Sequence, residues 1–291
     1  MGTTMNWPRF LVASIVSALF VIVIAIAWHG HFAASMYADF PARSADQVQL
    51  LMPFLVLTFL IQIPIFCYMY LRVYPQRSVN NAAKFGLWAG FFTMMPNGQF
   101  WVGTPGVGWD FLIMQIVQGT VTLIFTMVLF QLIYKPADES AAAPEINFGK
   151  FLPWGIGGAV LVFVLDLPFH QMLAPMLFGD QYPNPAFPSR QPDGAMLGEL
   201  AFTYLYQLTC FCYLYLRMYP QRTMTNALWF GTWLGFWVLI PNMQIFVAER
   251  EYTSFMLFIQ VPEGMILTII MMFYFAMAYR PKQTASLAAA A

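Results

Sequence analysis

The sequence predicts an all-α integral membrane protein with eight transmembrane helices in two parallel four-helix bundles related by a pseudo-twofold axis. Three observations lead to this prediction. Of the 291 residues, 60% are hydrophobic and only 9% are charged, whereas a soluble domain carries roughly 25% charged residues. The chain also contains two similar stretches, and each stretch holds four long apolar runs.

The apolar runs have the length of spanning helices, because the hydrocarbon core of a bilayer requires about 20 consecutive residues. A helix also closes its backbone hydrogen bonds internally, as lipid demands. In the first stretch the runs are residues 10–28, 50–71, 84–102 and 110–134. In the second stretch they are residues 151–170, 197–216, 226–247 and 253–279.

The similarity between the two stretches indicates an internal duplication. Residues 66–77 read FCYMYLRVYPQR and residues 211–222 read FCYLYLRMYPQR, which are identical at ten of twelve positions. This offset of 145 residues continues without a gap through the fourth run, and upstream it becomes 141, where His29 matches His170. Because each unit has an even number of spans, we expect both units to enter the membrane from the same side.

The duplication divides the chain into predicted domains. The first repeat is expected to cover residues 1–136 and the second to cover residues 149–282. Between them, residues 137–148 are polar with Pro and Ala, which favours a cytoplasmic linker. Residues 283–291 end in a low-complexity alanine stretch and are predicted to form a disordered tail.

The basic residues predict the orientation of the chain. Ten of the 13 Lys and Arg residues fall on one side of the predicted bundle, and the positive-inside rule assigns that side to the cytoplasm. Both termini are therefore expected in the cytoplasm, with the bacterial inner membrane or an intracytoplasmic membrane as the location. The ten are Arg9, Arg72, Arg77, Lys84, Lys135, Lys150, Arg217, Arg222, Arg280 and Lys282, against Arg43, Arg190 and Arg250.

Polar residues within the apolar runs are the strongest functional candidates, because each costs several kcal/mol in lipid unless it is paired. Asp166 precedes His170 by one helical turn, so their side chains share a face. Glu263 lies well inside the last run and shares its face with Gln260. We expect these four side chains to face protein and to line a ligand or proton pathway, although interhelical hydrogen bonding would also account for them.

The first half of the sequence retains only part of this set. Its fourth run carries glutamines in a polar stripe, and its first run carries no acid. The matched residues are Gln115 for Gln260, Gln118 for Glu263 and Ala25 for Asp166. Two copies that differ at buried charges favour one working site, in the second half.

The three histidines, His29, His31 and His170, close the first and fifth runs. Because His29 and His170 occupy matched positions, a pigment- or haem-binding subunit that uses both is the alternative prediction. A role at the membrane interface, with each imidazole bonded to a loop carbonyl, is also open. Met172 and Met176 follow His170, but no metal-ligand spacing accompanies them, so no metal site is predicted. The sequence identifies no cofactor.

A Pro-Asn-x-Gln pattern occurs at residues 96–99 and again at 241–244. Proline lacks a backbone donor and disrupts a helix, so the pattern predicts a turn that closes each third helix.

The patterns WHGHFAASMY, LDLPFHQMLAPMLFGDQY, KFGLWAG and WFGTWLG give each half a resemblance to a known family. The chain resembles, once per half, a family of small four-helix bacterial membrane proteins classed only as a domain of unknown function. The resemblance implies four helices per unit and implies no activity.

The sequence contains no nucleophile motif, phosphate-binding loop or zinc-protease motif, so no catalytic residue is predicted. A net charge of +0 gives no reason to expect a nucleic-acid partner. The expected partners are the lipid bilayer and other membrane protein subunits. We predict a non-enzymatic membrane protein, either an accessory subunit of a larger complex or a transporter-like module.

Overall fold

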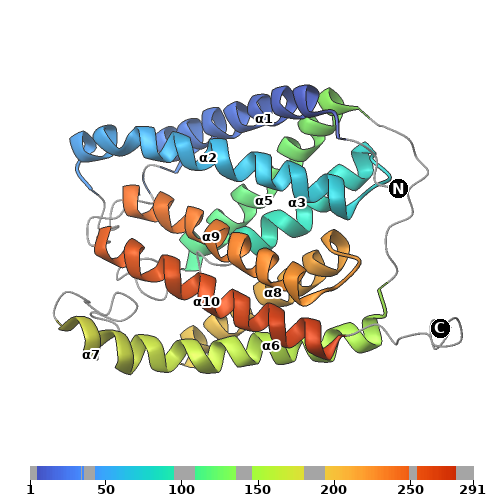
Figure 1. Cartoon of the computed structure of the whole chain (residues 1–291). Helices are drawn as coiled ribbons and strands as arrows, with labels where there is room; N and C mark the ends of the chain where they lie inside the picture. The colour runs from blue at the N-terminus through green and yellow to red at the C-terminus, as the bar shows by residue number, and fades with distance from the viewer. Residues whose placement is uncertain are drawn as a thin grey trace, which may run out of the picture.

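The computed structural model describes residues 5–33, 35, 43–94, 109–135, 146–179, 194–248 and 254–279. Within these residues it contains nine α-helices, two short π-helices and no strand. Figure 1 shows the long α-helices packed together in a bundle. The prediction of an all-α protein is therefore confirmed for the described part of the chain.

We call residues 5–135 the first half and residues 146–279 the second half. The helices of the first half are α1 (Trp7–Ala27), η1 (Trp28–Phe32), α2 (Ala45–Val73), α3 (Val79–Met94) and α5 (Trp109–Tyr134). Those of the second half are α6 (Phe148–Pro168), η3 (Phe169–Leu173), α7 (Ala174–Phe178), α8 (Gly194–Met218), α9 (Met224–Ala248) and α10 (Ser254–Ala278). Within the described residues a helix lies on each of the eight predicted apolar runs, and α3 covers the third run as far as Met94.

Parts of the predicted organisation lie outside the described residues. The third run is described only as far as Met94. The predicted linker, residues 137–148, is described only from Ile146 onward, and the predicted tail, residues 283–291, lies wholly outside the described residues.

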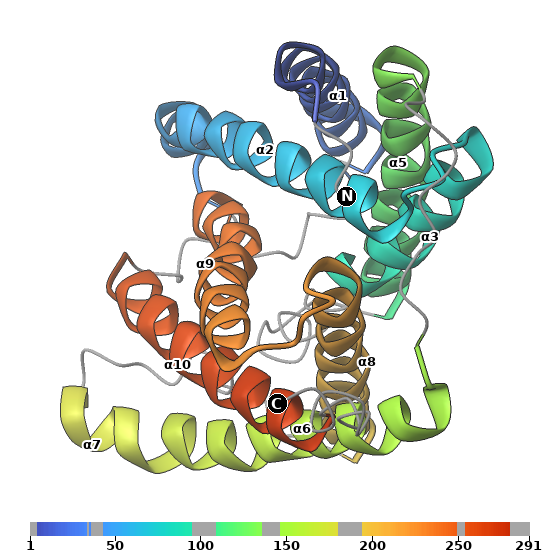
Figure 2. The ribbon, with the colours of Figure 1, turned by 45° about the vertical axis from the view of Figure 1, so that its right-hand side comes forward.

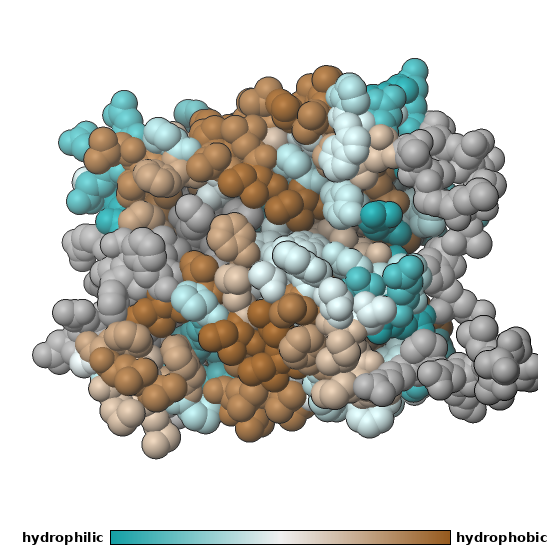
Figure 3. All heavy atoms as spheres, viewed as in Figure 1, coloured by the Kyte–Doolittle hydropathy of each residue, from teal (hydrophilic) through white to brown (hydrophobic). Residues whose placement is uncertain are grey.

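Five helical segments are long and apolar enough to cross a membrane. They are Trp7–Phe32, Ala45–Val73, Asp110–Tyr134, Phe148–Pro168 and Val261–Ala278. Their outward faces carry exposed aliphatic side chains such as Val23 (64% exposed) and Val164 (58%). Figure 3 shows brown, hydrophobic residues over much of the middle of one face and teal, hydrophilic residues mostly toward its left and right margins. The protein is a polytopic helical membrane protein.

Each half begins and ends at the same side of the bundle. The side chain of Asn6 caps α1 by accepting a hydrogen bond from the Arg9 amide, and Asn147 caps α6 in the same way. The Asn6 amide also donates to the hydroxyl of Tyr134 at the end of α5, and the Asn147 amide donates to Tyr279 after α10. The start of the first helix therefore meets the end of the last one in both halves.

Packing follows the same scheme in both halves. In the first, α1 contacts α2 and α5, and α3 contacts α5; in the second, α6 contacts α8 and α10, and α9 contacts α10. The halves meet where α2 packs on α9 and α3 on α8 (Figure 2). At this junction the rings of Phe66 and Trp237 lie 5.2 Å apart, edge to face, and both side chains are buried. The core therefore runs continuously through both halves.

Glycines allow two helix pairs to approach closely. A Cβ atom on Gly86 of α3 would lie 2.5 Å from the Cα atom of Ile124, and one on Gly231 of α9 would lie 2.7 Å from that of Ile269. Four residues further along, Gly90 and Gly235 make equally tight approaches to α5 and α10. This Gly-x-x-x-Gly spacing is the usual means of packing membrane helices backbone to backbone.

The predicted turn at residues 241–244 is wrong, because α9 continues through this segment to Ala248. Proline is tolerated inside membrane helices when neighbouring groups satisfy the backbone carbonyl that it frees. The matching segment, residues 96–99, lies outside the described residues.

Candidate carboxylate and histidine site

In each half the first helix is followed directly by a π-helical turn, close to the predicted end of the apolar run. His29 lies in η1 and His170 lies at the matched position in η3. The residue before η3 is Pro168, whereas Ala27 precedes η1, so proline is not required for the turn. A π-turn changes the direction of the side chains that follow it, and such turns are frequent at functional sites.

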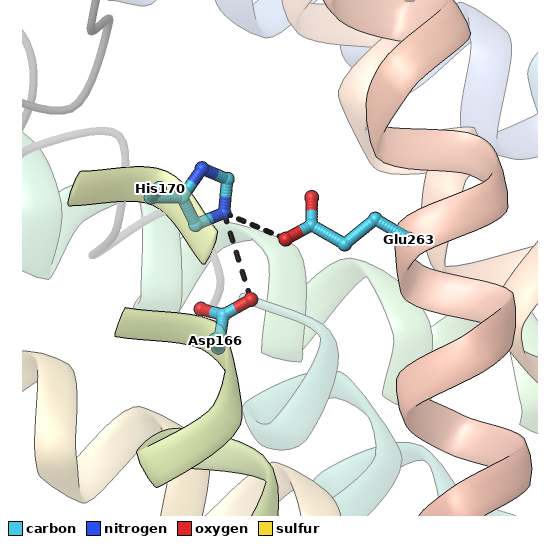
Figure 4. Close-up of side chains that lie close together, drawn as sticks. All are labelled: Asp166, His170 and Glu263. Carbon is cyan, nitrogen blue, oxygen red and sulfur yellow. Dashed lines mark ion pairs between the residues drawn. The ribbon is translucent and has the colours of Figure 1, made fainter. Parts of the chain in front are cut away.

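In the second half, three of the predicted residues come together. Nε2 of His170 lies 3.5 Å from Oδ1 of Asp166 and 3.2 Å from Oε1 of Glu263 (Figure 4). One ligand atom from each residue lies within 4.8 Å of the other two. Asp166 comes from α6 and Glu263 from α10, so the contact between these helices completes the site. The two carboxylates converge on a single nitrogen.

The site lies inside the bundle. The side chains of Asp166 and Glu263 are 10% and 7% exposed, and that of His170 is 23% exposed. Oε1 of Glu263 is within ion-pair distance of the imidazole, yet it accepts no hydrogen bond from the described residues, so the ring does not direct an N–H at it. A buried carboxylate oxygen without a donor is costly, which makes it available to a ligand.

A fourth side chain orients the site from α8. The hydroxyl of Tyr204 donates a hydrogen bond to Oδ2 of Asp166, which leaves Oδ1 directed toward His170. Tyr204 was not predicted from the sequence, because it is one of 14 tyrosines and only the packing of α8 on α6 brings it to the carboxylate. The sequence does hold one indication of its role: the matched residue in the first half is Phe59, which lacks the hydroxyl.

Neither carboxylate is neutralised by a basic side chain. Among the described residues, the ion pairs of Asp166 and Glu263 are those with His170, and neither residue pairs with Lys or Arg. Burying two acid groups beside a single imidazole is costly unless a proton or a cation compensates them. The arrangement is suited to attracting a cation.

Of the other predicted site residues, none is placed in this cluster. Gln260 lies in α10, but its side chain lies outside the described residues. Gln115 is half-buried on α5, and the Gln118 amide donates to Thr122 on its own helix. In η1, His29 is half-buried and His31 is exposed. The pigment- or haem-binding alternative through His29 and His170 stays a prediction.

The fold and this site define a class: a helical membrane protein with a buried carboxylate–histidine cluster in its second half. Comparison of the chain with protein-family models, with curated proteins and with solved structures found no match. The resemblance to small four-helix membrane proteins therefore stays a prediction.

Proposed function

We propose that the protein is a non-enzymatic, transporter-like membrane module that binds and passes a cation at the cluster of Asp166, His170 and Glu263. The observation that carries this proposal is the burial of two carboxylates against one imidazole with no Lys or Arg paired to either among the described residues. Ionisable groups within membrane helices are rare, and they mark ion and substrate pathways.

The proposal includes eight spans in two parallel, related halves with both termini in the cytoplasm. Contacts that recur at the offset of 145 residues support this architecture. Tyr70 donates to the Ser78 carbonyl as Tyr215 does to that of Thr223. Further matched pairs are Trp88 to Tyr74 with Trp233 to Tyr219, and Arg77 over Tyr134 with Arg222 over Tyr279.

Cysteine labelling tests this architecture. Gln76 and Gln221 lie in the matched turns after α2 and α8, and single Gln→Cys substitutions there are expected to react with a membrane-impermeant thiol reagent from the same side. Labelling of the two positions from opposite sides would contradict parallel halves.

The transport function is tested by cation flux into proteoliposomes that contain the purified full chain. Glu263→Gln removes the carboxylate while it keeps the size of the side chain, and we expect at least a tenfold loss of flux. Gln118→Ala, at the matched position of the first half, is the control and is expected to change flux less than twofold. Equal flux through Glu263→Gln and the wild type, with protons and metal cations each offered, would overturn the proposal.

A further inference from the structure

We infer that the cluster of Asp166, His170 and Glu263 is a binding site for a divalent first-row transition-metal ion. The metal is the cation of the proposed function, and only its transport, not its binding, rests on that proposal. The three ligand atoms are Oδ1 of Asp166, Nε2 of His170 and Oε1 of Glu263.

The spacing of these atoms fits a metal ion. Ligand atoms that lie about 2.1 Å from a metal, at angles of about 90° to 110° to one another, are roughly 3.0–3.4 Å apart. The nitrogen lies 3.2 Å and 3.5 Å from the two oxygens. All three ligand atoms lie within 4.8 Å of one another, so the cluster must close around an ion to bring all three into its first coordination shell.

The unpartnered oxygen is the independent observation. Glu263 is 9% exposed as a residue, and its Oε1 points at the imidazole without accepting a hydrogen bond from the described residues (Figure 4). A metal ion held between Nε2 and Oε1 would satisfy this oxygen and replace the missing donor. It would also neutralise the two carboxylates, which no Lys or Arg among the described residues does.

The donor set selects the class of metal. One imidazole and two carboxylates suit borderline to hard divalent ions such as Zn²⁺ and Mn²⁺, whereas Cu(I) prefers thioether and thiolate sulfur. Met172 and Met176, the nearest methionines in sequence, are 71% and 74% exposed and do not belong to the cluster. Three protein ligands leave a coordination position for water, which suits an ion that must leave again.

Tyr204 acts as a positioning residue for the ligand Asp166. Its hydroxyl fixes one oxygen of Asp166 and so directs the other oxygen toward the ion, as second ligand shells do in metalloproteins.

The test is metal binding by the purified full chain after treatment with a chelator. Isothermal titration with Zn²⁺ and separately with Mn²⁺, supported by elemental analysis, is expected to give one equivalent per chain. Glu263→Gln and Asp166→Asn are expected to weaken binding at least 100-fold, and Asp166→Glu, which keeps a carboxylate, to weaken it less. His29→Gln, at the position that matches His170, is the control and is expected to bind as the wild type does.

Two results would overturn the inference. One is monodisperse wild-type protein that binds neither ion, and the other is binding that persists in Glu263→Gln. The flux assay separates this inference from the proposed function. Zn²⁺ binding that depends on Glu263, without flux, supports a resident metal and rejects transport. Proton flux that depends on Glu263, without metal binding, supports transport and rejects the metal.

Discussion

The two halves have the same scaffold and differ in the side chains that it presents at one place. Both halves pass from their first helix into a π-turn with a histidine at the same position. Around His170 the second half places Asp166, Tyr204 and Glu263, whereas the first half has Ala25, Phe59 and Gln118 at the matched positions. The two halves therefore share a helical arrangement, and the carboxylate–histidine site depends on three side chains that the first half lacks.

The polar groups of the two matched last helices also differ in how they are paired. In the first half, Gln118 donates to Thr122 on the same helix and needs no partner from elsewhere. In the second half, Glu263 meets a histidine from another helix and keeps one oxygen without a donor. A neutral amide can satisfy itself locally in a membrane, but a carboxylate requires a proton, a cation or a basic partner.

The largest expected effect comes from rebuilding the site in the first half. The combined substitutions Ala25→Asp, Phe59→Tyr and Gln118→Glu place the missing groups around His29. Because the ligands and the tyrosine that orients one of them would then match those of the second half, we expect Zn²⁺ binding to rise from one equivalent to about two. Titration of the folded variant measures this directly. A stoichiometry that stays at one would show that the scaffolds are not equivalent.

Substitution of the glycines at the close helix contacts tests whether Zn²⁺ binding depends on the packing of the second half alone. Gly86→Ala and Gly231→Ala each drive a Cβ atom into the backbone of a neighbouring helix, and overpacking of this kind costs about 1–3 kcal/mol. Both variants should melt at a lower temperature in detergent. Only Gly231→Ala should also weaken Zn²⁺ binding, because α9 supports the helix that carries Glu263.

Gly198→Ala is the control for these two variants, because a Cβ atom there would meet nothing within 4 Å. Equal loss of Zn²⁺ affinity in Gly86→Ala and Gly231→Ala would contradict a site that belongs to the second half.

The smallest expected effect concerns the orienting hydroxyl. Tyr204→Phe removes the hydrogen bond to Asp166 and keeps the ring, so Zn²⁺ affinity should fall about tenfold, the lower end of the loss seen when a hydrogen-bond partner of a metal ligand is removed. The matched reverse change, Phe59→Tyr alone, should leave affinity unchanged. If Tyr204→Phe binds as the wild type does, Tyr204 has no positioning role.

Much of the helical scaffold was predictable from the sequence, because a membrane imposes long apolar runs. Within the described residues each of the eight runs contains a helix, and five helical segments are candidate spans. The pairing of Asp166 with His170 was also predictable, since residues four apart share a helix face. The turn at residues 241–244 was predicted wrongly, because a proline rule taken from water does not carry over to a packed membrane helix.

The remainder of the site depends on contacts between helices that are distant in the sequence. Glu263 was recognised as a costly acid, but its meeting with His170 follows from the packing of α10 on α6. The π-turns were not predictable, since η1 and η3 share little sequence beyond the histidine. The close approach of α9 to α10 likewise depends on which face of each helix turns inward.

The most direct test of a cation site confined to the second half is X-ray absorption at the zinc K edge on protein loaded with one equivalent of Zn²⁺. We predict a first shell of nitrogen and oxygen at about 2.0–2.1 Å, with one imidazole and no sulfur. The imidazole signal should disappear in His170→Gln and persist in His29→Gln. Two imidazoles in the shell, a sulfur ligand, or an imidazole signal that survives His170→Gln would contradict the account.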